Sequence, residues 1–275
     1  MTLTLVITTY NWPEALHTVL LSVQRQSRPP TEVIVADDGS DSRTRELIEQ
    51  SRAQLKVPLM HSWHEDLGFR AARSRNLAIA KARGDYIAMI DGDMILHPNF
   101  IEDHSNYAKR GYFIQGARAK LSAAGTKHVL EAQNIDITLL DRRLKSKRYG
   151  VYSKTLSWLF SGTRLINKLS NIQTCNMAFF KSDCINVNGF NEDFVGWGRE
   201  DSEFGARLFH AGIKRRDLRF NAVAYHLHHE GASRKMLDKN HQIFLATLND
   251  RKRWCDNGID KHLQHIVRKA KKFTQ

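Results

Sequence analysis

The sequence predicts an α/β fold in which helices flank a central sheet. Nearly continuous apolar and β-branched stretches, such as LTLVITTY at residues 3–10, are typical of strands that are covered on both faces. Stretches with the helical spacing of apolar residues lie between them. The order strand, helix, strand, helix, helix, strand over residues 3–94 is typical of a sheet built with right-handed crossovers.

Each element has local signals in the chain. The expected elements are, in order, a strand over 3–10, a helix over 13–26, a strand over 31–40, a helix over 41–54, a helix over 70–84 and a strand over 85–94. Pro13 stands in the first turn of its helix, where its missing N–H costs nothing. A capping aspartate or serine opens the helix over 41–54. Gly84 is the expected stop of the third helix.

Composition limits the partners and the compartment. The chain of 275 residues has a net charge of +13, which favours an anionic partner such as nucleic acid, an acidic membrane surface or a phosphorylated small molecule. Its three cysteines have no paired spacing, which favours a reducing cytoplasm. The N-terminus does not read as a signal peptide, and no stretch approaches the ~20 apolar residues of a membrane span. We therefore expect a cytoplasmic protein, with peripheral attachment to the inner face of the membrane as an option.

Polar side chains follow three of the expected strands. They are Thr8, Thr9, Tyr10 and Asn11 at the end of the first strand, Asp37 and Asp38 with Gly39 and Ser40 after the second, and Asp91 and Asp93 within MIDGDMIL after the last. A turn or a helix cap is the simpler interpretation of any single aspartate. The carboxyl ends of parallel strands meet at one sheet edge, however, where ligands bind. A D-x-D pair there can present oxygen atoms to Mg²⁺ or Mn²⁺, which in turn holds phosphate.

Four motifs occur in an order that resembles a known family. They are VITTYN at 6–11, VADDGS at 35–40, GFRAARSRNLAIAKARGDYIAMIDGDM at 68–94 and GWGREDSEFGARLFHAG at 196–212. Together they resemble the family 2 glycosyltransferases of the GT-A fold. The branch that they resemble contains the bacterial chondroitin polymerase domains and the β-1,4-galactosyltransferases, with their G-W-G-x-E-D signature. The resemblance covers roughly residues 1–110 and 172–230.

The resemblance implies the fold and its division. We expect a GT-A domain over 1–230, with a mixed, mostly parallel sheet flanked by helices. Residues 1–110 would be its nucleotide-binding half and residues 111–230 its acceptor half. A basic, helical C-terminal extension would occupy residues 231–275.

The resemblance also implies a binding site for a UDP-sugar donor. Thr8 and Tyr10 would line the base pocket, and Asp38 would hydrogen-bond the uracil edge. Asp37 is a weaker candidate from the same turn. Arg75, from the family's R-N pair, would contact the diphosphate or the sugar.

The metal-ligating residues follow from the same resemblance. Asp91 would contact the ribose or the sugar, and Asp93 would ligate the metal directly. The family's third ligand corresponds to a histidine in AYHLHHE, where strand alternation places His226 and His228 on one face. We expect His226 to be the ligand, with His228 as second choice. A carboxylate with imidazole suits Mn²⁺ better than Mg²⁺.

The acidic motif after residue 195 implies the catalytic residues. Acids in a first helical turn often only complement the helix dipole. By the resemblance, Asp201 is the general base that deprotonates the acceptor hydroxyl, and Glu200 positions the acceptor. Trp197 is predicted either to stack on a sugar or to lie in the core. Met177 is predicted to form a wall of the donor-sugar pocket, with an ordinary core position as the alternative.

A basic segment points to the acceptor. Residues 142–182 contain nine Lys or Arg and no Asp or Glu. They fall where family members have acceptor-binding loops, which favours a saccharide or glycolipid acceptor that is phosphorylated or acidic. Residues 155–169 could form an interfacial helix, and the basic tail over 261–275 could lie on an anionic membrane surface. The alternative is a solvated charged face.

The expected activity is therefore an inverting, metal-dependent transfer from a UDP-sugar. The transferred group would be a hexose or an N-acetylhexosamine, and the acceptor would belong to a bacterial surface glycan such as lipopolysaccharide, O-antigen or capsule. A sugar-nucleotide nucleotidyltransferase is one alternative, but TTYNWPEA lacks its glycine-rich phosphate loop. A nucleic-acid binder is the other, suggested by charge alone, and no recognition motif for nucleic acid occurs.

Overall fold

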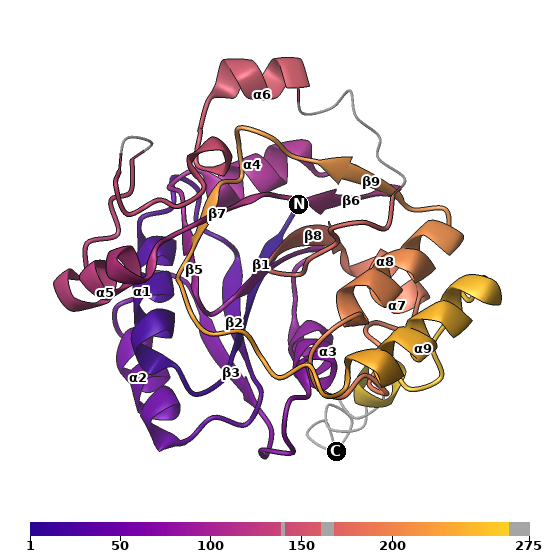
Figure 1. Cartoon of the computed structure of the whole chain (residues 1–275). Coiled ribbons are helices and arrows are strands. Elements are labelled where there is room, and N and C mark those ends of the chain that lie inside the picture. The colour runs from indigo at the N-terminus through magenta and orange to yellow at the C-terminus, as the bar shows by residue number, and fades with distance from the viewer. Residues whose placement is uncertain (139–140, 161–167, 264–275) are drawn as a thin grey trace, which may run out of the picture.

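A seven-stranded sheet with helices on both faces forms the centre of the computed structural model (Figure 1), which describes residues 1–138, 141–160 and 168–263. In spatial order its strands are β3 (Leu59–Trp63), β2 (Glu32–Asp37), β1 (Leu3–Thr9), β4 (Tyr86–Asp91), β8 (Asn176–Phe180), β6 (Tyr112–Gln115) and β9 (Lys214–Asp217). The first four are parallel, β8 is antiparallel to both of its neighbours, and β9 is parallel to β6. The predicted α/β architecture is confirmed.

Helices cover the two faces of this sheet. The helices of the described residues are α1 (Pro13–Gln24), α2 (Ser42–Arg52), α3 (Ala71–Lys81), α4 (Phe100–Tyr107), α5 (Ala123–Ala132), α6 (Lys154–Phe160), α7 (Lys181–Asn186), α8 (Glu200–His210) and α9 (Leu237–Asn249), with a 3₁₀ turn over Lys147–Tyr149, and six of them (α1 to α4, α7 and α8) pack on the sheet. Alternation along β1 sends Leu5 and Ile7 into the core under α1, α2 and α4. Val6 points into the opposite core, which α3, α7 and α8 cover.

Between the first and the last of the strands predicted over residues 3–94, one strand was missing from the sequence prediction. Residues 59–63 form β3, which pairs in parallel with β2, where the prediction had one helix following another directly. β3 is at the edge of the sheet and contains His61, Ser62 and the exposed Trp63. An edge strand is covered less than a central one, so it lacks the continuous apolar run that identified the others.

The predicted stop of α3 was also wrong. The helix ends at Lys81, and Ala82 is already extended. Gly84 lies beyond the helix, where a Cβ would come within 2.7 Å of the Thr4 backbone nitrogen. The glycine is needed for this close approach to β1 rather than for the helix end.

A small second sheet lies beside the carboxyl edge of the first. Its strands are β5 (Met94–Leu96), β10 (Ala224–His226) and β7 (Arg118–Lys120), with β10 antiparallel to β5 and parallel to β7. The register pairs His226 with Met94, and the Leu227 N–H donates to the Asp93 carbonyl at 3.0 Å. This pairing brings a distant histidine-containing segment to the D-x-D turn.

The remaining predictions concern the C-terminal part and the surface. α9 packs against α8 through Phe244, which contacts Phe194 and Ala206. The predicted interfacial helix is described only as α6, and residues 161–167 and the basic tail after 263 lie outside the described residues. Among the helices of the described part, none is both long and apolar enough to cross a membrane. Cys175, Cys184 and Cys255 are buried free thiols.

Candidate active site

The polar residues that end β1, β2 and β4 lie side by side. In the sheet register Thr9 pairs with Asp37, and Thr8 pairs with Asp91. The Gly92 N–H donates to the Thr8 carbonyl at 2.7 Å, and a Cβ on Gly92 would be only 2.9 Å from Thr9 Oγ1. Only glycine therefore lets the D-G-D turn approach β1 this closely. The expected convergence at the carboxyl edge is present.

The two aspartates after β2 have different environments. Asp37 is fully buried, and its oxygens accept from the Ser40 N–H and lie 2.8 Å from His61 Nε2, so it stabilises the turn. Asp38 accepts from the backbone N–H of Arg70 at 2.8 Å and lies 3.1 Å from His64 Nε2. This contact raises the pKa of His64. Of the two aspartates, Asp37 thus uses its carboxylate for contacts within the fold.

Tyr10 stands at the outer edge of the same site. Its ring is half exposed, and its hydroxyl donates to Asp66 Oδ2 at 2.9 Å. Gly39, with φ of +97°, brings the turn after β2 against Asp66, because a Cβ there would lie 2.5 Å from the Asp66 Cα. The hydroxyl of Thr8 is buried and has no hydrogen-bond partner among the described residues. Tyr10 and Thr8 therefore present a ring face and a hydroxyl at the ligand edge of the sheet.

Arg75 joins the donor side of the site to the acidic motif of α8. Its buried guanidinium lies 3.2 Å from Asp201 Oδ1, 3.5 Å from Glu200 Oε1 and 3.7 Å from Asp91 Oδ1. Burial raises the pKa of Glu200 and of Asp91, as do the carboxylates near each, and Arg75 opposes both effects. The three acids lie around one permanent positive charge, which offsets part of their mutual repulsion.

Asp201 has a second anchor. The Thr174 N–H donates to its Oδ2 and the Thr174 hydroxyl donates to its Oδ1, both at 3.0 Å. Thr174 is fully buried, just before β8. Sequence reasoning did not select Thr174, because an isolated threonine before a strand has no motif signal.

A second cluster lies at Asp93. Its Oδ2 is 3.3 Å from His226 Nε2 and 3.1 Å from His229 Nε2, and one potential ligand atom from each of the three residues lies within 4.8 Å of the others. Asp93 Oδ1 is buried without a hydrogen-bond partner among the described residues. Burial lowers the pKa of His226 to about 4, whereas the hydrogen bond that the His229 ring donates to Asp93 raises the pKa of His229 to about 8. A carboxylate with one unpartnered oxygen, from Asp93, and the neutral imidazole of His226 are ligands that suit a divalent cation.

The structure places His229, rather than the predicted second choice His228, beside Asp93. β10 ends at His226, so strand alternation does not extend to His228. The His228 side chain is exposed outside the cluster, while its backbone N–H donates to Thr126 Oγ1 at 2.7 Å. The ring of His229 meets the edge of Trp12 at a centroid distance of 6.0 Å.

Two further predicted residues have clear positions. Trp197 is 40% exposed, which excludes a core position for its ring, and the Arg234 guanidinium lies 5.6 Å from its centroid. Met177 is fully buried in the apolar core that α3 and α8 cover. For Met177, the structure agrees with the core alternative rather than with a pocket wall.

Comparisons with known proteins identify the family. Residues 4–182 match the family "Glycosyl transferase family 2", and residues 155–230 match a family described as "N-terminal domain of galactosyltransferase". Chondroitin synthase of Escherichia coli is 27% identical over 245 residues, which cover 82% of this chain and 34% of that protein. Hyaluronan synthase of Pasteurella multocida is 29% identical over 234 residues, which cover 76% of this chain and 23% of that protein.

A smaller enzyme and a solved structure are also similar. Validoxylamine A glucosyltransferase of Streptomyces hygroscopicus subsp. limoneus is 28% identical over 232 residues, which cover 77% of this chain and 48% of that protein. The chain thus spans less than half the length of these three relatives. The crystal structure of residues 1–349 of S. aureus TarS in complex with UDP-GlcNAc superposes with a TM-score of 0.62 at 17% identity, covering 97% of this chain and 72% of that one. It has the same GT-A fold.

These matches favour neither of the two alternatives weighed from the sequence, a nucleotidyltransferase or a nucleic-acid binder. The strand-end motifs, the acidic motif of α8 and the two histidines at and after the end of β10 all lie at one sheet edge, and the family match spans the first two thirds of the chain. The chain belongs to glycosyl transferase family 2.

Proposed function

We propose that the protein transfers a hexose or an N-acetylhexosamine from a UDP-sugar to a saccharide acceptor, with inversion and with a divalent metal. One observation supports this most directly. Arg75 contacts Asp91 at the D-x-D turn and Asp201 at the start of α8, so a donor and an acceptor bound at these elements would meet. Structures of S. aureus TarS with UDP and with UDP-GlcNAc support UDP as the nucleotide.

The nucleotide would bind across the ends of β1 and β2. Tyr10 offers a half-exposed ring against the base, and Asp38 offers a carboxylate to the uracil edge. The unpartnered hydroxyl of Thr8 can bond the same ligand. Asp91, whose side chain is 35% exposed, would accept from a hydroxyl of the ribose or the sugar. Asp37 would act only by shaping the turn.

A divalent cation, Mn²⁺ in preference to Mg²⁺, would be held by Asp93, His226 and His229. Bound there, it would offset the negative charge that develops on the departing diphosphate. His226 is neutral over the physiological range, which is the form that ligates a metal. His229 must lose its proton before it can bind, so metal affinity should rise with pH near 8.

Asp201 would act as the general base. A carboxylate offers about four lone-pair positions, and Thr174 and Arg75 use three of those on Asp201. The remaining one can accept the proton of the acceptor hydroxyl as its oxygen bonds to the anomeric carbon. The bond from that carbon to the UDP oxygen breaks in the same step, which inverts the configuration. Glu200 and the exposed ring of Trp197 would position the acceptor.

The proposal extends to the chemistry of the acceptor and to a surface that could contact a membrane. The acid-free segment 142–182 favours a phosphorylated or acidic saccharide or glycolipid of a bacterial surface glycan. α6 exposes Trp158, Leu159 and Phe160 in succession, with Lys154 exposed on the same helix. Exposed aromatic residues beside cations suit an anionic lipid surface. Nucleic acid is not proposed as a partner.

The donor assignment has a direct test. Thermal unfolding is followed with UDP-, GDP-, CMP-, dTDP- and ADP-sugars, each with and without Mn²⁺. A ligand at ~100 times its Kd adds about 2.7 kcal/mol to the free energy of unfolding. We expect one UDP-sugar to raise the Tm only with Mn²⁺ present, and equal stabilisation without the metal would refute the metal part. A shift with another nucleotide instead would refute the UDP part.

A further inference from the structure

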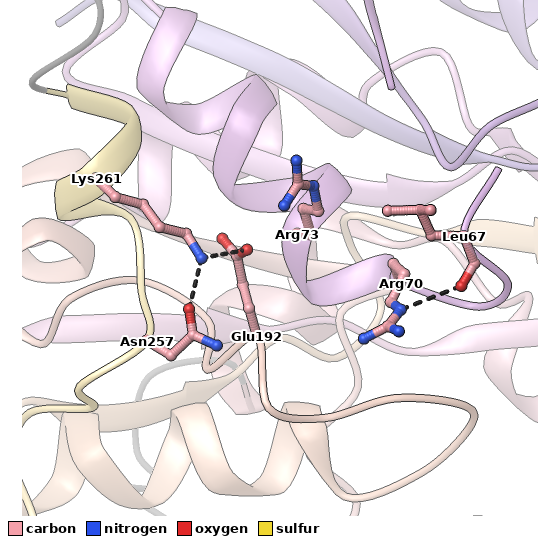
Figure 2. Close-up of a pocket in the computed structure, with 6 residues that line it drawn as sticks. All are labelled: Leu67, Arg70, Arg73, Glu192, Asn257 and Lys261. Carbon is pink, nitrogen blue, oxygen red and sulfur yellow. Dashed lines mark hydrogen bonds and ion pairs between the residues drawn. The ribbon is translucent and has the colours of Figure 1, made fainter. Parts of the chain in front are cut away.

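A separate pocket lies where the start of α3 faces the C-terminal segment. Its volume is about 200 Å³, and Figure 2 shows the six residues that line it: Leu67, Arg70, Arg73, Glu192, Asn257 and Lys261. None of them belongs to the donor or metal sites proposed above. Three are cations and only one is an acid, so the pocket has an excess of positive charge.

The acid and one cation neutralise each other. Lys261 Nζ lies 2.7 Å from Glu192 Oε2 and donates to Asn257 Oδ1, as the dashed lines in Figure 2 show. The other oxygen of Glu192 is 2.7 Å from His262 Nε2 and accepts from Asn76 Nδ2 at 2.9 Å. Three of the about four lone-pair positions of Glu192 thus face Lys261, His262 and Asn76, and Lys261 balances its charge.

The two arginines remain uncompensated. Neither Arg70 nor Arg73 forms an ion pair with an acid among the described residues, and in Arg70 the Nε donates only to the Leu67 carbonyl at 3.2 Å. The Nε of Arg73 is shielded from solvent and has no hydrogen-bond partner there. The nearby Asp38 accepts from the backbone N–H of Arg70 and lies 3.1 Å from His64 Nε2, and among the described residues no ion pair joins it to either arginine side chain.

The backbone adds to this positive potential. α3 begins directly after Arg70 and has no side-chain cap, so its first N–H groups and the positive end of its dipole are near the pocket. Two guanidinium groups, one with a buried and unpartnered N–H, provide the planar donor geometry that carboxylates and phosphates accept. The chemistry of the pocket is that of an oxyanion site.

We propose that this pocket binds a carboxylate or phosphate group of the acceptor. The loop before α3 connects it to the acceptor side, because the Phe69 carbonyl accepts from the Gly196 N–H at 3.0 Å. Gly196 belongs to the turn that leads through Trp197 to Asp201. The link to the acceptor rests on the proposed function, whereas oxyanion binding itself does not.

The test measures oxyanion binding by the full chain, without donor or metal. Inorganic phosphate and glucuronate are titrated separately at constant ionic strength, and heat release and Tm are followed. We expect saturable binding of one of them, which identifies the anionic group, and a loss of affinity of about tenfold in Arg73→Gln and in Arg70→Gln. Arg28→Gln, at an exposed arginine elsewhere, serves as the matched control and should bind as wild type.

Two results would overturn the proposal. One is the absence of saturable binding of either anion, and the other is equal affinity in all the variants, which would mean an adventitious ion only. Asp93→Ala separates this inference from the proposed function, since it should lose Mn²⁺-dependent donor binding and keep oxyanion binding. Acceptor affinity should then fall in Arg73→Gln for an anionic acceptor while donor affinity stays constant, and unchanged acceptor affinity would refute the link to the acceptor.

Discussion

Three acids around one buried guanidinium determine the electrostatics of the candidate active site. Arg75 is 4% exposed, and its partners come from β4 and from the first turn of α8. The sequence resemblance suggested that Arg75 contacts the donor. Its observed contacts favour a further role, in which it holds the Asp201 carboxylate in place. A carboxylate that is held in place before substrate binds does not have to reorganise during the reaction.

Thr174 allows this positioning to be tested. Thr174→Val removes the hydroxyl that donates to Asp201 Oδ1 but keeps the N–H that donates to Oδ2. We expect kcat to fall by about 10- to 100-fold, because the base loses one of its fixed bonds, while the KM for the donor stays within about twofold. Thr174→Ser restores the hydroxyl and should restore kcat. A valine variant with wild-type kcat would show that the hydroxyl does not position the base.

Sequence motifs identified some residues of the candidate site, whereas others could be found only from the folded structure. The D-x-D and E-D pairs could be selected from the sequence because the acids of each pair are at most two positions apart, fall at predicted element ends and match the family's motifs. His229 and Thr174 could not. The position of His229 depends on where β10 stops, and the partner of Thr174 is 27 residues away in the chain. Their selection as functional residues stays a prediction until activity is measured.

At the scale of elements, a buried histidine connects α4 to the sheet. His104 Nε2 donates to Asn176 Oδ1 of β8 at 3.0 Å, since the Asn176 amide donates to the carbonyls of Ala117 and Ala222. Burial lowers the pKa of His104 to about 4. The neutral ring is therefore part of the folded structure, and its protonation opposes folding.

This pKa predicts a loss of stability in acid. The unfolded histidine titrates near 6.5, so the contribution of the neutral ring is complete above about pH 6.5 and is lost as the pH falls towards 4. The loss amounts to roughly 3 kcal/mol by linkage. In urea unfolding at pH 7 and pH 4.5, His104→Gln should lose less stability on acidification than wild type or the exposed control His128→Gln. An equal loss in all three would contradict this assignment.

The central strands that the sequence predicted share one property, which is burial on both faces. β1, β2 and β4 are nearly continuous apolar runs, so their pattern reflects the core directly. β3 and the three strands of the small sheet are short or at an edge, and tertiary pairing rather than local pattern determines them. Such elements place His226 beside Asp93, which explains why the metal cluster was only partly predictable.

For the whole molecule, the distribution of charge and apolar surface determines the possible partners. The net charge is +13, and α6 lies away from the central sheet at the top of Figure 1. Ser157 attaches it to the body through a 2.9 Å hydrogen bond with the Tyr107 hydroxyl, while Trp158 is 78% exposed. Burying that ring in lipid would remove a large apolar area from water.

Vesicle binding tests this surface. We expect the protein to sediment with vesicles that contain anionic lipid and to be released by salt, because the attraction is partly electrostatic. Trp158→Ser should weaken binding by about tenfold through lost apolar burial. Trp254→Ser, at another exposed tryptophan outside α6, is the control and should bind as wild type. Equal binding of both variants would exclude α6 as the contact.

The division of work between the two acidic motifs is the central claim, and paired binding and turnover measurements on Asp93→Ala and Asp201→Asn test it most directly. Calorimetry measures UDP-sugar binding with Mn²⁺, and UDP release measures turnover. Asp93→Ala should lose metal-dependent binding, since Asp93 contacts both histidines of the proposed metal site. Asp201→Asn should bind the donor as wild type and lose transfer. Wild-type transfer by Asp201→Asn, or unchanged metal-dependent binding by Asp93→Ala, would contradict the account.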